Sequence, residues 1–301
     1  MSSETVGFVG VGAIGRPMAQ CLVAAGHDVV VHDIDPDVAA SLDGARALAT
    51  AAEVARQADV VFVCLPAAQH LRQVVTGPEG LLAGGRMSVL VHTGTSGAAV
   101  VEELADRLGP VALVDAPVTG GVPRAREGTL TAIVAGPTEV LDRVGRYLEA
   151  FASKIIKVSA RPGDAQRMKL VNNFLSAGNL ALACEALVLG RGAGLAPEAI
   201  MEVVNSGSGQ NSATLTKLPD NVIPRNFSRG GQIGMLLKDL REAEAQGRAC
   251  GVEMPLGDTV REVFARAVAE GDVTDDSTSV ILHMERAAGL DGPSDTERLR
   301  R

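Results

Sequence analysis

A glycine-rich turn between a short apolar strand and a helix limits the possible folds of this chain more than any other segment. Residues 6–9 (VGFV) predict a buried strand, the turn 10–15 (GVGAIG) follows, and a helix is expected through about Ala25. A second strand is expected at 28–32 and ends at Asp33. This order of strand, glycine turn, helix, strand and acid is typical of a dinucleotide-binding βαβ unit.

The glycines of this turn have separate structural roles. Gly10 permits the tight turn, Gly12 lets a pyrophosphate approach the backbone, and Gly15 lets the helix pack closely against the strand. The phosphates are expected at the start of the helix, where free N–H groups and the helix dipole attract anions. Asp33 is expected to accept hydrogen bonds from the ribose hydroxyls and to repel a 2′-phosphate, which favours NAD over NADP. The expected cofactor-binding residues of the turn are Gly10, Val11, Gly12, Ala13, Ile14 and Gly15.

Strands and helices go on alternating through the first half of the chain. Repeated βα units of this kind predict a Rossmann-type, doubly wound parallel sheet. Residues 1–162 are therefore predicted to form an NAD-binding domain. Residues 163–301 show only helical segments and are predicted to form an all-α domain for substrate binding and dimerisation, with a frayed tail, DGPSDTERLRR (291–301). The further strands are expected at 58–64, 88–92, 111–114, 130–135 and 154–158.

The segment 163–195 has the longest run of helical periodicity in the chain. Lys169 and Asn173 lie four apart in it and therefore project from the same side of the helix. They are either an ordinary solvated pair or an amine and an amide that hold an oxygen-rich ligand. A lysine that is partly desolvated can act as a general base. The apolar positions that predict one buried helix face are Ala165, Met168, Val171, Leu175, Leu182 and Ala186.

Three further segments carry polar groups that each have two possible roles. Residues 119–121 (TGG) offer a hydroxyl and consecutive N–H groups, which suit either an anion-binding nest or a tight surface turn. Thr95 and Ser96 follow a strand, and capping of the next helix would explain their hydroxyls. Lys238 and Asp239 form a pair on a helix surface, or Lys238 reaches the mouth of the cleft.

The composition opposes several other classes of function. A formal net charge of −8 disfavours binding to phosphate backbones, and 2% aromatic residues with no Trp leave few side chains for base stacking. We expect a small anionic substrate, attracted by cations local to its pocket, and no nucleic-acid partner. Neither a signal peptide nor an uninterrupted apolar run of roughly 18 residues is present, so no membrane partner and a cytoplasmic location are expected.

The four cysteines, Cys21, Cys64, Cys184 and Cys250, are far apart and form no CxxC pair. Disulfides and zinc ligation are therefore not expected, and the cysteines are predicted to be small buried residues in a reducing compartment. No metal site is predicted.

Four motifs, in the correct order, resemble those of the β-hydroxyacid dehydrogenase family, which includes 3-hydroxyisobutyrate dehydrogenase and tartronate semialdehyde reductase. The resemblance covers about 5 to 290 of the chain. The 6-phosphogluconate dehydrogenases share the first domain but are much longer. The motifs are GFVGVGAIGRPMAQCL (7–22) for the cofactor, DAPVTGGVPRAREGTL (115–130) for the substrate, GDAQRMKLVNN (163–173) for catalysis and KDL (238–240) late in the chain.

The resemblance implies a role for each matching residue. Lys169 matches the catalytic lysine, a general acid or base toward the substrate oxygen, and Asn173 matches the asparagine that holds the substrate. Thr119, Gly120 and Gly121 match the carboxylate-binding turn, with Thr119 in place of the commoner Ser. The family also implies a helical second domain entered through a long interdomain helix, and homodimers or homotetramers. The further residues implied to contact the cofactor are Leu65, Pro66, Thr95 and Lys238.

Several positions depart from the family pattern. Ala165 stands where a second glycine is usual and could narrow the approach to the cofactor. Gly94 replaces the usual Ser, and His92 replaces the usual Asp. Arg124 and Arg126 in the substrate motif either read a second acidic group on the substrate or are solvated. These differences concern the identity of the substrate more than the type of reaction.

The sequence therefore predicts an NAD-dependent oxidoreductase that transfers a hydride between nicotinamide and a small 3-hydroxy acid or its semialdehyde, with Lys169 as general acid or base. An imine reductase on the same fold is one alternative, and the retention of Lys169 argues against it. A non-catalytic dinucleotide-binding module is another, and the presence of both Lys169 and Asn173 argues against that.

Overall fold

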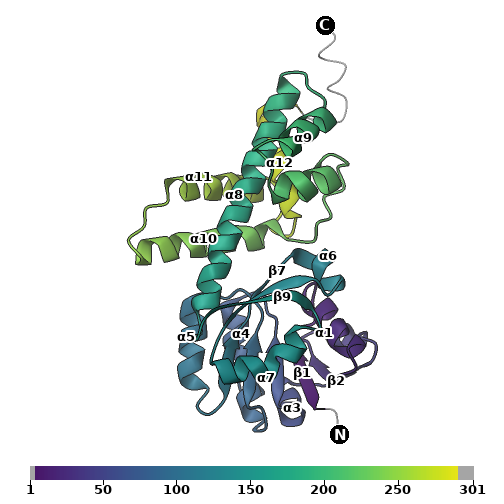
Figure 1. The fold of residues 1–301 in the computed structure, drawn as a ribbon, viewed down its shortest axis with the longest axis vertical. Coiled ribbons are helices and arrows are strands. Elements are labelled where there is room, and N and C mark those ends of the chain that lie inside the picture. The colour runs from purple at the N-terminus through teal and green to yellow at the C-terminus, as the bar shows by residue number, and fades with distance from the viewer. Residues whose placement is uncertain (1–3, 291–301) are drawn as a thin grey trace. The chain divides into compact units, whose positions relative to one another are not determined.

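The computed structural model describes residues 4–290, and its internal contacts divide the chain into two compact units, one through Lys169 and one from Leu170 onward (Figure 1). The boundary expected between 162 and 163 lies just before the long helix that begins in the first unit and continues into the second. The predicted frayed tail at 291–301 lies outside the described residues.

The first unit is built on one twisted sheet, ordered β3-β2-β1-β4-β5-β6-β8-β7 with β9 beside β8. Strands β1 to β6 are parallel, and the order reverses between β1 and β4, which is the doubly wound topology that the sequence predicted. Only β6 and β7 pair with β8 in the antiparallel sense. The strands are β1 (Thr5–Val9), β2 (Asp28–His32), β3 (Ala45–Ala47), β4 (Val60–Val63), β5 (Val89–His92), β6 (Ala112–Asp115), β7 (Val118–Thr119), β8 (Leu130–Ala135) and β9 (Ala152–Ser159).

Helices cover both faces of this sheet (Figure 1). Strand β4 is buried along its whole length, as expected for a parallel strand between two helical layers. The short elements β3, β7, α2 and α6 were not individually predicted. The helices are α1 (Gly15–Ala24), α2 (Pro36–Ala40), α3 (Ala51–Gln57), α4 (Ala68–Thr76), the 3₁₀ turn η1 (Leu81–Ala83), α5 (Ala98–Arg107), α6 (Gly121–Arg126) and α7 (Thr138–Leu148).

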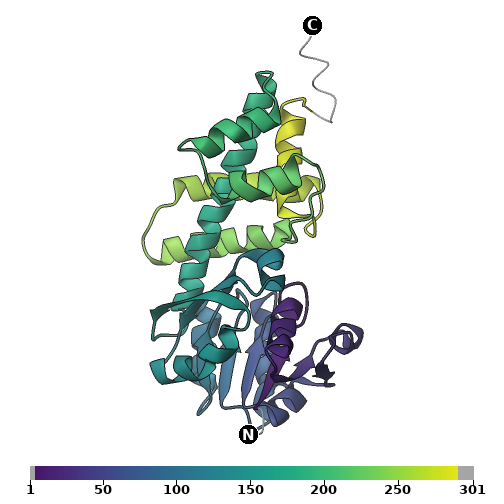
Figure 2. The same ribbon diagram turned by 45° about the vertical axis from the view of Figure 1, so that its right-hand side comes forward.

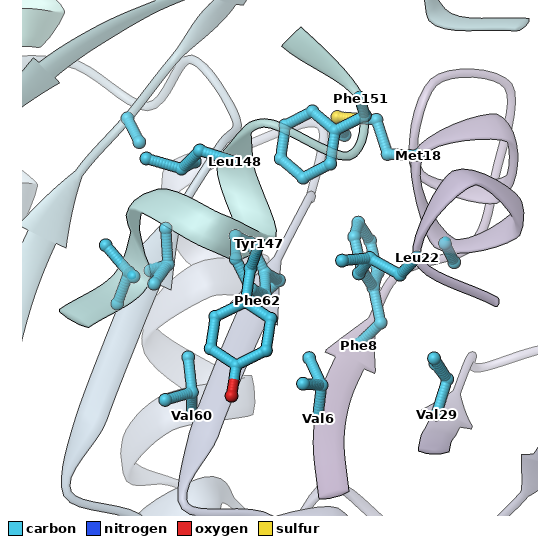
Figure 3. Close-up of a cluster of buried hydrophobic side chains, with 14 of the residues drawn as sticks. Val6, Phe8, Met18, Leu22, Val29, Val60, Phe62, Tyr147, Leu148 and Phe151 are labelled. Carbon is cyan, nitrogen blue, oxygen red and sulfur yellow. The ribbon is translucent and has the colours of Figure 1, made fainter. Parts of the chain in front are cut away.

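Aromatic side chains lie in the core on one face of the sheet, between β1, β4 and the end of α7 (Figure 3). The Phe62 ring makes edge contacts with Tyr147 and Phe151, at centroid distances of 6.3 and 5.8 Å, and stacks with Phe8 at 5.9 Å. Aromatic pairs of this geometry add to the stabilisation from burial alone. They hold the end of α7 against β1 and β4, and β1 is the strand that leads into the glycine turn.

The second unit is helical, and no strand occurs among residues 160–290, where Gln232 and Asp276 form one isolated bridge. The α10 and α11 helices pack side by side in both views of the fold (Figures 1 and 2). The elements are α8 (Asp164–Gly192), α9 (Pro197–Ser206), the π-helix η2 (Ala213–Val222), α10 (Ile233–Ala249), α11 (Pro255–Glu270), the 3₁₀ turn η3 (Ser277–Ser279) and α12 (Val280–Ala287).

The buried face predicted for α8 is wrong. Of the six residues that defined it, Ala165 is buried, but the others are exposed, from Met168 at 46% to Leu182 at 63%. Alanine and cysteine positions shifted around the helix form most of the real buried face. Because α8 is apolar on more than one side, periodicity alone could not select the correct one. The buried residues from Leu170 onward are Leu170, Ala177, Leu180, Ala181, Ala183, Cys184 and Leu187.

Helix α8 is also long and apolar enough to pass a length-and-composition test for a membrane span, with a mean hydropathy of 1.3 over its best window. The sequence-based expectation of no such segment relied on the absence of an uninterrupted apolar run, and Glu185 is the charge that interrupts this helix. Core helices of soluble proteins pass the same test, so the finding is weak evidence for a membrane. Of the cysteines expected to be buried, Cys184 is buried but Cys250 is exposed, which corrects that prediction.

Candidate active site

The carboxyl ends of the parallel strands form one edge of the sheet in the first unit, and the predicted cofactor residues follow those ends. Gly10 comes directly after β1, Asp33 after β2, Leu65 and Pro66 after β4, and Thr95 after β5. Backbone hydrogen bonds continue past the strands and hold these loops together. They run from Gly10 N to His32 O, from Cys64 N to Val9 O, from Thr93 N to Val63 O and from Ala116 N to His92 O, at 2.8 to 2.9 Å.

The glycine turn leaves room for a ligand at one of its three glycines. Gly10 has φ +88°, and a Cβ there would lie 2.3 Å from the carbonyl oxygen of Cys64. A Cβ on Gly15 would lie 1.9 Å from the carbonyl oxygen of Gly10, so the chain itself fills both places. A Cβ on Gly12 would meet no atom within 4 Å. The turn therefore fits a dinucleotide pyrophosphate at Gly12, beside the start of α1.

Asp33 is held beside the glycine turn. Its Oδ2 accepts the N–H of Val11 at 2.8 Å, and its Oδ1 accepts the N–H of Asp35 at 3.1 Å. These bonds leave lone pairs of both oxygens for ribose hydroxyls.

A buried carboxylate, Asp115 at the end of β6, organises the start of α8. Its Oδ2 accepts the N–H groups of Gly163 at 3.0 Å and Gln166 at 3.1 Å, and its Oδ1 accepts the Gln166 side-chain amide at 2.7 Å. The same amide of Gln166 donates to Gly94 O at 3.1 Å, and its Oε1 accepts the Ser96 N–H at 2.9 Å. Gln166 thus connects the loop that carries Thr95, the strand that leads to the substrate motif, and the helix that carries Lys169.

The electrostatic balance at Asp115 follows from this geometry. Burial raises the pKa of its carboxyl to about 6, and hydrogen bonds from Gln166 and Gly163 oppose that rise. The amide of Gln166 has a fixed orientation, because one end must accept from Ser96 and the other must donate to Gly94. Both oxygens of Asp115 are therefore acceptors, as in the ionised form.

Lys169 lies one turn after Gln166 in α8 and is only 9% exposed. Such burial is unusual for a lysine and argues against the solvated interpretation. The position of its backbone is set by the Asp115 and Gln166 contacts at the start of the helix.

The departures at positions 92 and 94 belong together. The His92 ring is buried, and a Cβ on Gly94 would lie 3.0 Å from its Cε1 and 2.7 Å from the carbonyl oxygen of Leu65. A serine at 94 would clash with the Leu65 carbonyl oxygen and press against the His92 ring. Ser96 does not cap α5, because the cap residue is Gly97 with φ +80° and no side-chain cap bond, so the capping interpretation is wrong.

The third departure, Ala165, does not face open space. Its methyl group is fully buried in a small apolar cluster with Ile133, Ala135 and, at its edge, Val158. The extra methyl fastens the first turn of α8 to β8 and β9 through apolar contact.

The predicted carboxylate-binding turn has the backbone of a tight turn. Thr119 ends β7, and Gly120 and Gly121 both have positive φ, +133° and +74°. A Cβ on Gly120 would lie 2.9 Å from Cδ of Arg124, so geometry alone accounts for that glycine. Arg124 and Arg126 are exposed on α6, which supports their solvated interpretation.

In the second unit the structure brings together Asn173 and Lys238 through Asp239. Asn173 Nδ2 donates to Asp239 Oδ2 at 2.6 Å, and Lys238 Nζ lies 3.2 Å from Asp239 Oδ1 and 3.7 Å from Glu242. Asp239 is 8% exposed, so Lys238 and Asp239 are not a simple surface pair. Burial, with Asp239 nearby, raises the pKa of Glu242.

Asp115, Gln166 and Asp239 were not identified from the sequence as functional residues. Asp115 and Gln166 belong to the substrate motif (115–130) and the catalytic motif (163–173). The one sequence signal for Asp115 was its position directly after the apolar strand expected at 111–114. Within residues 4–290, no group of three or more His, Cys, Asp or Glu side chains is arranged to hold a metal ion.

Comparisons with known proteins agree with this architecture. The model of the NAD-binding domain of 6-phosphogluconate dehydrogenase matches residues 5–159. The model described as NAD-binding of NADP-dependent 3-hydroxyisobutyrate dehydrogenase matches residues 163–284.

Relatives cover nearly the whole chain. A 2-(hydroxymethyl)glutarate dehydrogenase from Eubacterium barkeri is 32% identical over 96% of this chain and 97% of its own. A 3-hydroxyisobutyrate dehydrogenase from Pseudomonas aeruginosa is 35% identical over 91% of this chain and 96% of its own. The crystal structure of a 3-hydroxyisobutyrate dehydrogenase from Salmonella typhimurium superposes with a TM-score of 0.84 at 27% identity, over 93% of this chain and 100% of that one. The glycine turn, the doubly wound sheet, the helical second unit and these matches show that the chain belongs to the β-hydroxyacid dehydrogenase family of NAD(P)-binding oxidoreductases.

Proposed function

We propose that this protein oxidises a small 3-hydroxy acid to its semialdehyde, or catalyses the reverse reduction, with NAD. The cofactor, when bound, supplies a nicotinamide that exchanges a hydride with the hydroxyl-bearing carbon of the substrate. Lys169 takes the hydroxyl proton during oxidation and returns it during reduction. Thr119, Gly120, Gly121 and Asn173 hold the substrate carboxylate.

The observation that carries this proposal is the burial of Lys169 next to the Gln166 anchor. A buried amine on a rigid helix start, tied by Gln166 to the Thr95 loop, suits proton transfer near a cofactor bound along the strand ends. A solvated lysine on a flexible loop would support no such role.

Replacing the lysine tests its role directly. General acid–base catalysis contributes about 10²–10⁴-fold, so Lys169→Ala should lower kcat by that factor while dinucleotide affinity stays near that of the wild type. Initial rates of NADH formation and a dinucleotide titration measure the two effects. Lys154→Ala, at an exposed position of β9, is the control. A loss of only two- or threefold in Lys169→Ala would remove Lys169 from the proposal.

Preference for NAD is supported by Asp33, whose carboxylate is fixed beside the glycine turn. We expect kcat/KM to be higher with NAD than with NADP, because a 2′-phosphate next to this carboxylate is repelled. A clear preference for NADP would contradict this part of the proposal and leave the reaction type intact.

The substrate class needs a panel of compounds. The useful set is 3-hydroxyisobutyrate, glycerate, 3-hydroxypropionate, 2-(hydroxymethyl)glutarate and a cyclic imine, assayed by NADH formation or consumption. Turnover of the imine alone would favour an imine reductase. Dinucleotide binding without turnover of any compound would favour a non-catalytic module.

The state of assembly and the location remain predictions. A homodimer or homotetramer is supported by the exposed apolar side chains Val171, Leu175, Leu182 and Leu189 along α8, since a continuous apolar strip favours burial between protein copies. Light scattering coupled to size-exclusion chromatography would measure the mass in solution. A cytoplasmic location is a further prediction, and cell fractionation would test it.

A further inference from the structure

A half-buried cation in the second unit has no role in the proposed reaction. Lys217 lies on the π-helix η2, and its ammonium donates a hydrogen bond to Ser176 Oγ of α8 at 3.0 Å. Both side chains are only partly accessible to solvent. Ser176 follows Asn173 by three residues, so the two lie on neighbouring turns of the same helix side.

The surroundings of Lys217 do not neutralise its charge. Burial first, and Arg229 second, lower the pKa of the Lys217 amine to about 8, while Cys184 and Asp276 oppose the change. The pKa of the Cys184 thiol is raised to about 12 by burial, so the thiol carries no charge at neutral pH. Asp276 already accepts hydrogen bonds from Gly230 and from the N–H and hydroxyl of Thr278.

Within residues 4–290, no carboxylate forms an ion pair with Lys217. By contrast, the buried Glu285 in the same unit is paired with both Arg191 and Arg225. The free energy lost when an ammonium is removed from water exceeds what one hydrogen bond to a neutral hydroxyl restores. A second cation nearby increases that loss. Asp276 is near enough to act on the charge of Lys217 but forms no ion pair with it, so the ammonium has no direct anionic partner among the described residues.

The position of Lys217 along α8 suggests where that anion would belong. At about 1.5 Å per residue, Ser176 lies roughly 10 Å beyond Lys169 along the helix axis and roughly 4–5 Å beyond Asn173. A substrate with its hydroxyl at Lys169 and its carboxylate at Asn173 would direct a further substituent toward Ser176. Two carbons and a terminal carboxylate span roughly 4 Å at about 1.5 Å per bond, which matches the step from Asn173 to Ser176.

We propose that Lys217 and Ser176 form a subsite for a second acidic group of the substrate, so that the preferred substrates are 3-hydroxy acids with an additional carboxylate. This inference rests on the proposed function, because it uses the roles of Lys169 and Asn173. It also assigns the second carboxylate to residues of the helical unit rather than to Arg124 and Arg126, which are exposed in the substrate motif of the first unit.

Three compounds that share one reacting core test the proposal. 3-Hydroxyisobutyrate carries a methyl group at C2, 2-(hydroxymethyl)glutarate carries a two-carbon arm with a carboxylate there, and 2-propyl-3-hydroxypropanoate carries a neutral arm of similar length. A charge-assisted hydrogen bond corresponds to roughly 10- to 100-fold in affinity, so kcat/KM for the dicarboxylate should exceed that for both others by about that factor. The preference should appear mainly in KM.

The variant Lys217→Gln should reduce the preference for the dicarboxylate at least tenfold, while Lys154→Gln, at an exposed lysine of β9, leaves the preference as in the wild type. Ser176→Ala should have a smaller effect in the same direction. The unfolding temperature of Lys217→Gln, compared with that of the wild type, shows whether a loss of activity comes from a folding defect or from a binding defect. Equal losses with all three compounds would assign Lys217 a structural role and overturn the subsite.

The possible failures are distinguishable. Turnover of 3-hydroxyisobutyrate with no preference for the dicarboxylate would overturn the subsite and leave the proposed function standing. A preference that the neutral propyl compound shares would attribute the effect to size and would also overturn the subsite. Absence of NADH formation with all three compounds and with the wider panel would remove the proposed function and this inference together.

Discussion

Asp115 in the first unit and Glu285 in the second are both buried carboxylates, but they have different partners. Asp115 is held by neutral donors, the N–H groups of Gly163 and Gln166 and the Gln166 amide. Glu285 is held by two guanidinium groups, those of Arg191 and Arg225. The donors of Asp115 lie where the loop with Thr95, the end of β6 and the start of α8 meet, and these segments carry predicted site residues. The partners of Glu285 connect parts of the helical second unit. We therefore expect Asp115 and Gln166 to affect the reaction and Glu285 to affect folding.

The largest expected effect is a loss of stability on replacement of Glu285, which would show that this residue acts in folding. Glu285→Gln keeps the shape of the side chain but leaves two cations facing a neutral amide, so the free energy of unfolding should fall by about 3–5 kcal/mol. Urea denaturation measures it. The kcat of the folded fraction should change little. Glu103→Gln, which breaks an exposed and solvent-screened ion pair with Arg72, should lower the free energy of unfolding far less. Equal costs for the two variants would contradict the structural role of Glu285.

The next effect concerns the pH dependence of stability at Asp115. Its pKa rises from 3.8 to about 6 on folding, so the folded protein binds a proton more tightly than the unfolded chain does. The contribution of Asp115 to stability is therefore greatest in acid and falls as the pH rises from about 4 to about 6, by at most about 3 kcal/mol.

The measurement is the difference in unfolding free energy between the wild type and Asp115→Asn across this pH range. The variant is expected to be less stable overall, because its amide nitrogen would face the Gln166 amide. The test depends on how the free energy of unfolding changes with pH, so a lower overall stability of the variant does not affect it. Parallel curves for the two proteins would show that Asp115 does not titrate in this range.

The smallest effect tests the connection to the reaction. Gln166→Leu removes the bonds to Gly94, Ser96 and Asp115 together, so kcat/KM should fall about 10- to 100-fold through a higher KM for the dinucleotide and a lower kcat. Gln20→Leu, at an exposed position of α1, is the matched control. A loss of stability with unchanged kinetics would assign Gln166, like Glu285, to folding alone.

The sequence predicted the first unit better than the second for a physical reason. Strands covered on both faces, such as β4, appear as continuous apolar runs, and both β2 and β8 have the predicted bounds. Helix α8 is apolar around much of its circumference, so the pattern gave its existence but not its buried face. Composition and periodicity describe how a segment meets a core, and they do so least clearly when several sides are apolar.

The candidate site was predictable where one short motif carries the chemistry. Lys169, Asn173 and the glycine turn were identified in this way. The Asp115 network was not, because its members lie 48 to 72 residues apart in the chain and meet only through the sheet edge. Asp239 was noted as a partner of Lys238, but its bond to Asn173 joins residues 66 positions apart. Such contacts depend on tertiary structure and leave no local pattern.

The close contact between position 94 and its neighbours restricts which substitutions this site can accept. A Cβ at 94 would lie 2.7 Å from the Leu65 carbonyl oxygen and 3.0 Å from Cε1 of His92. A serine at this position therefore requires the Leu65 backbone to shift, and a smaller residue at 92 would relieve the remaining contact. Substitutions at 92 and 94 are expected to be epistatic, because the two side chains compete for the same space.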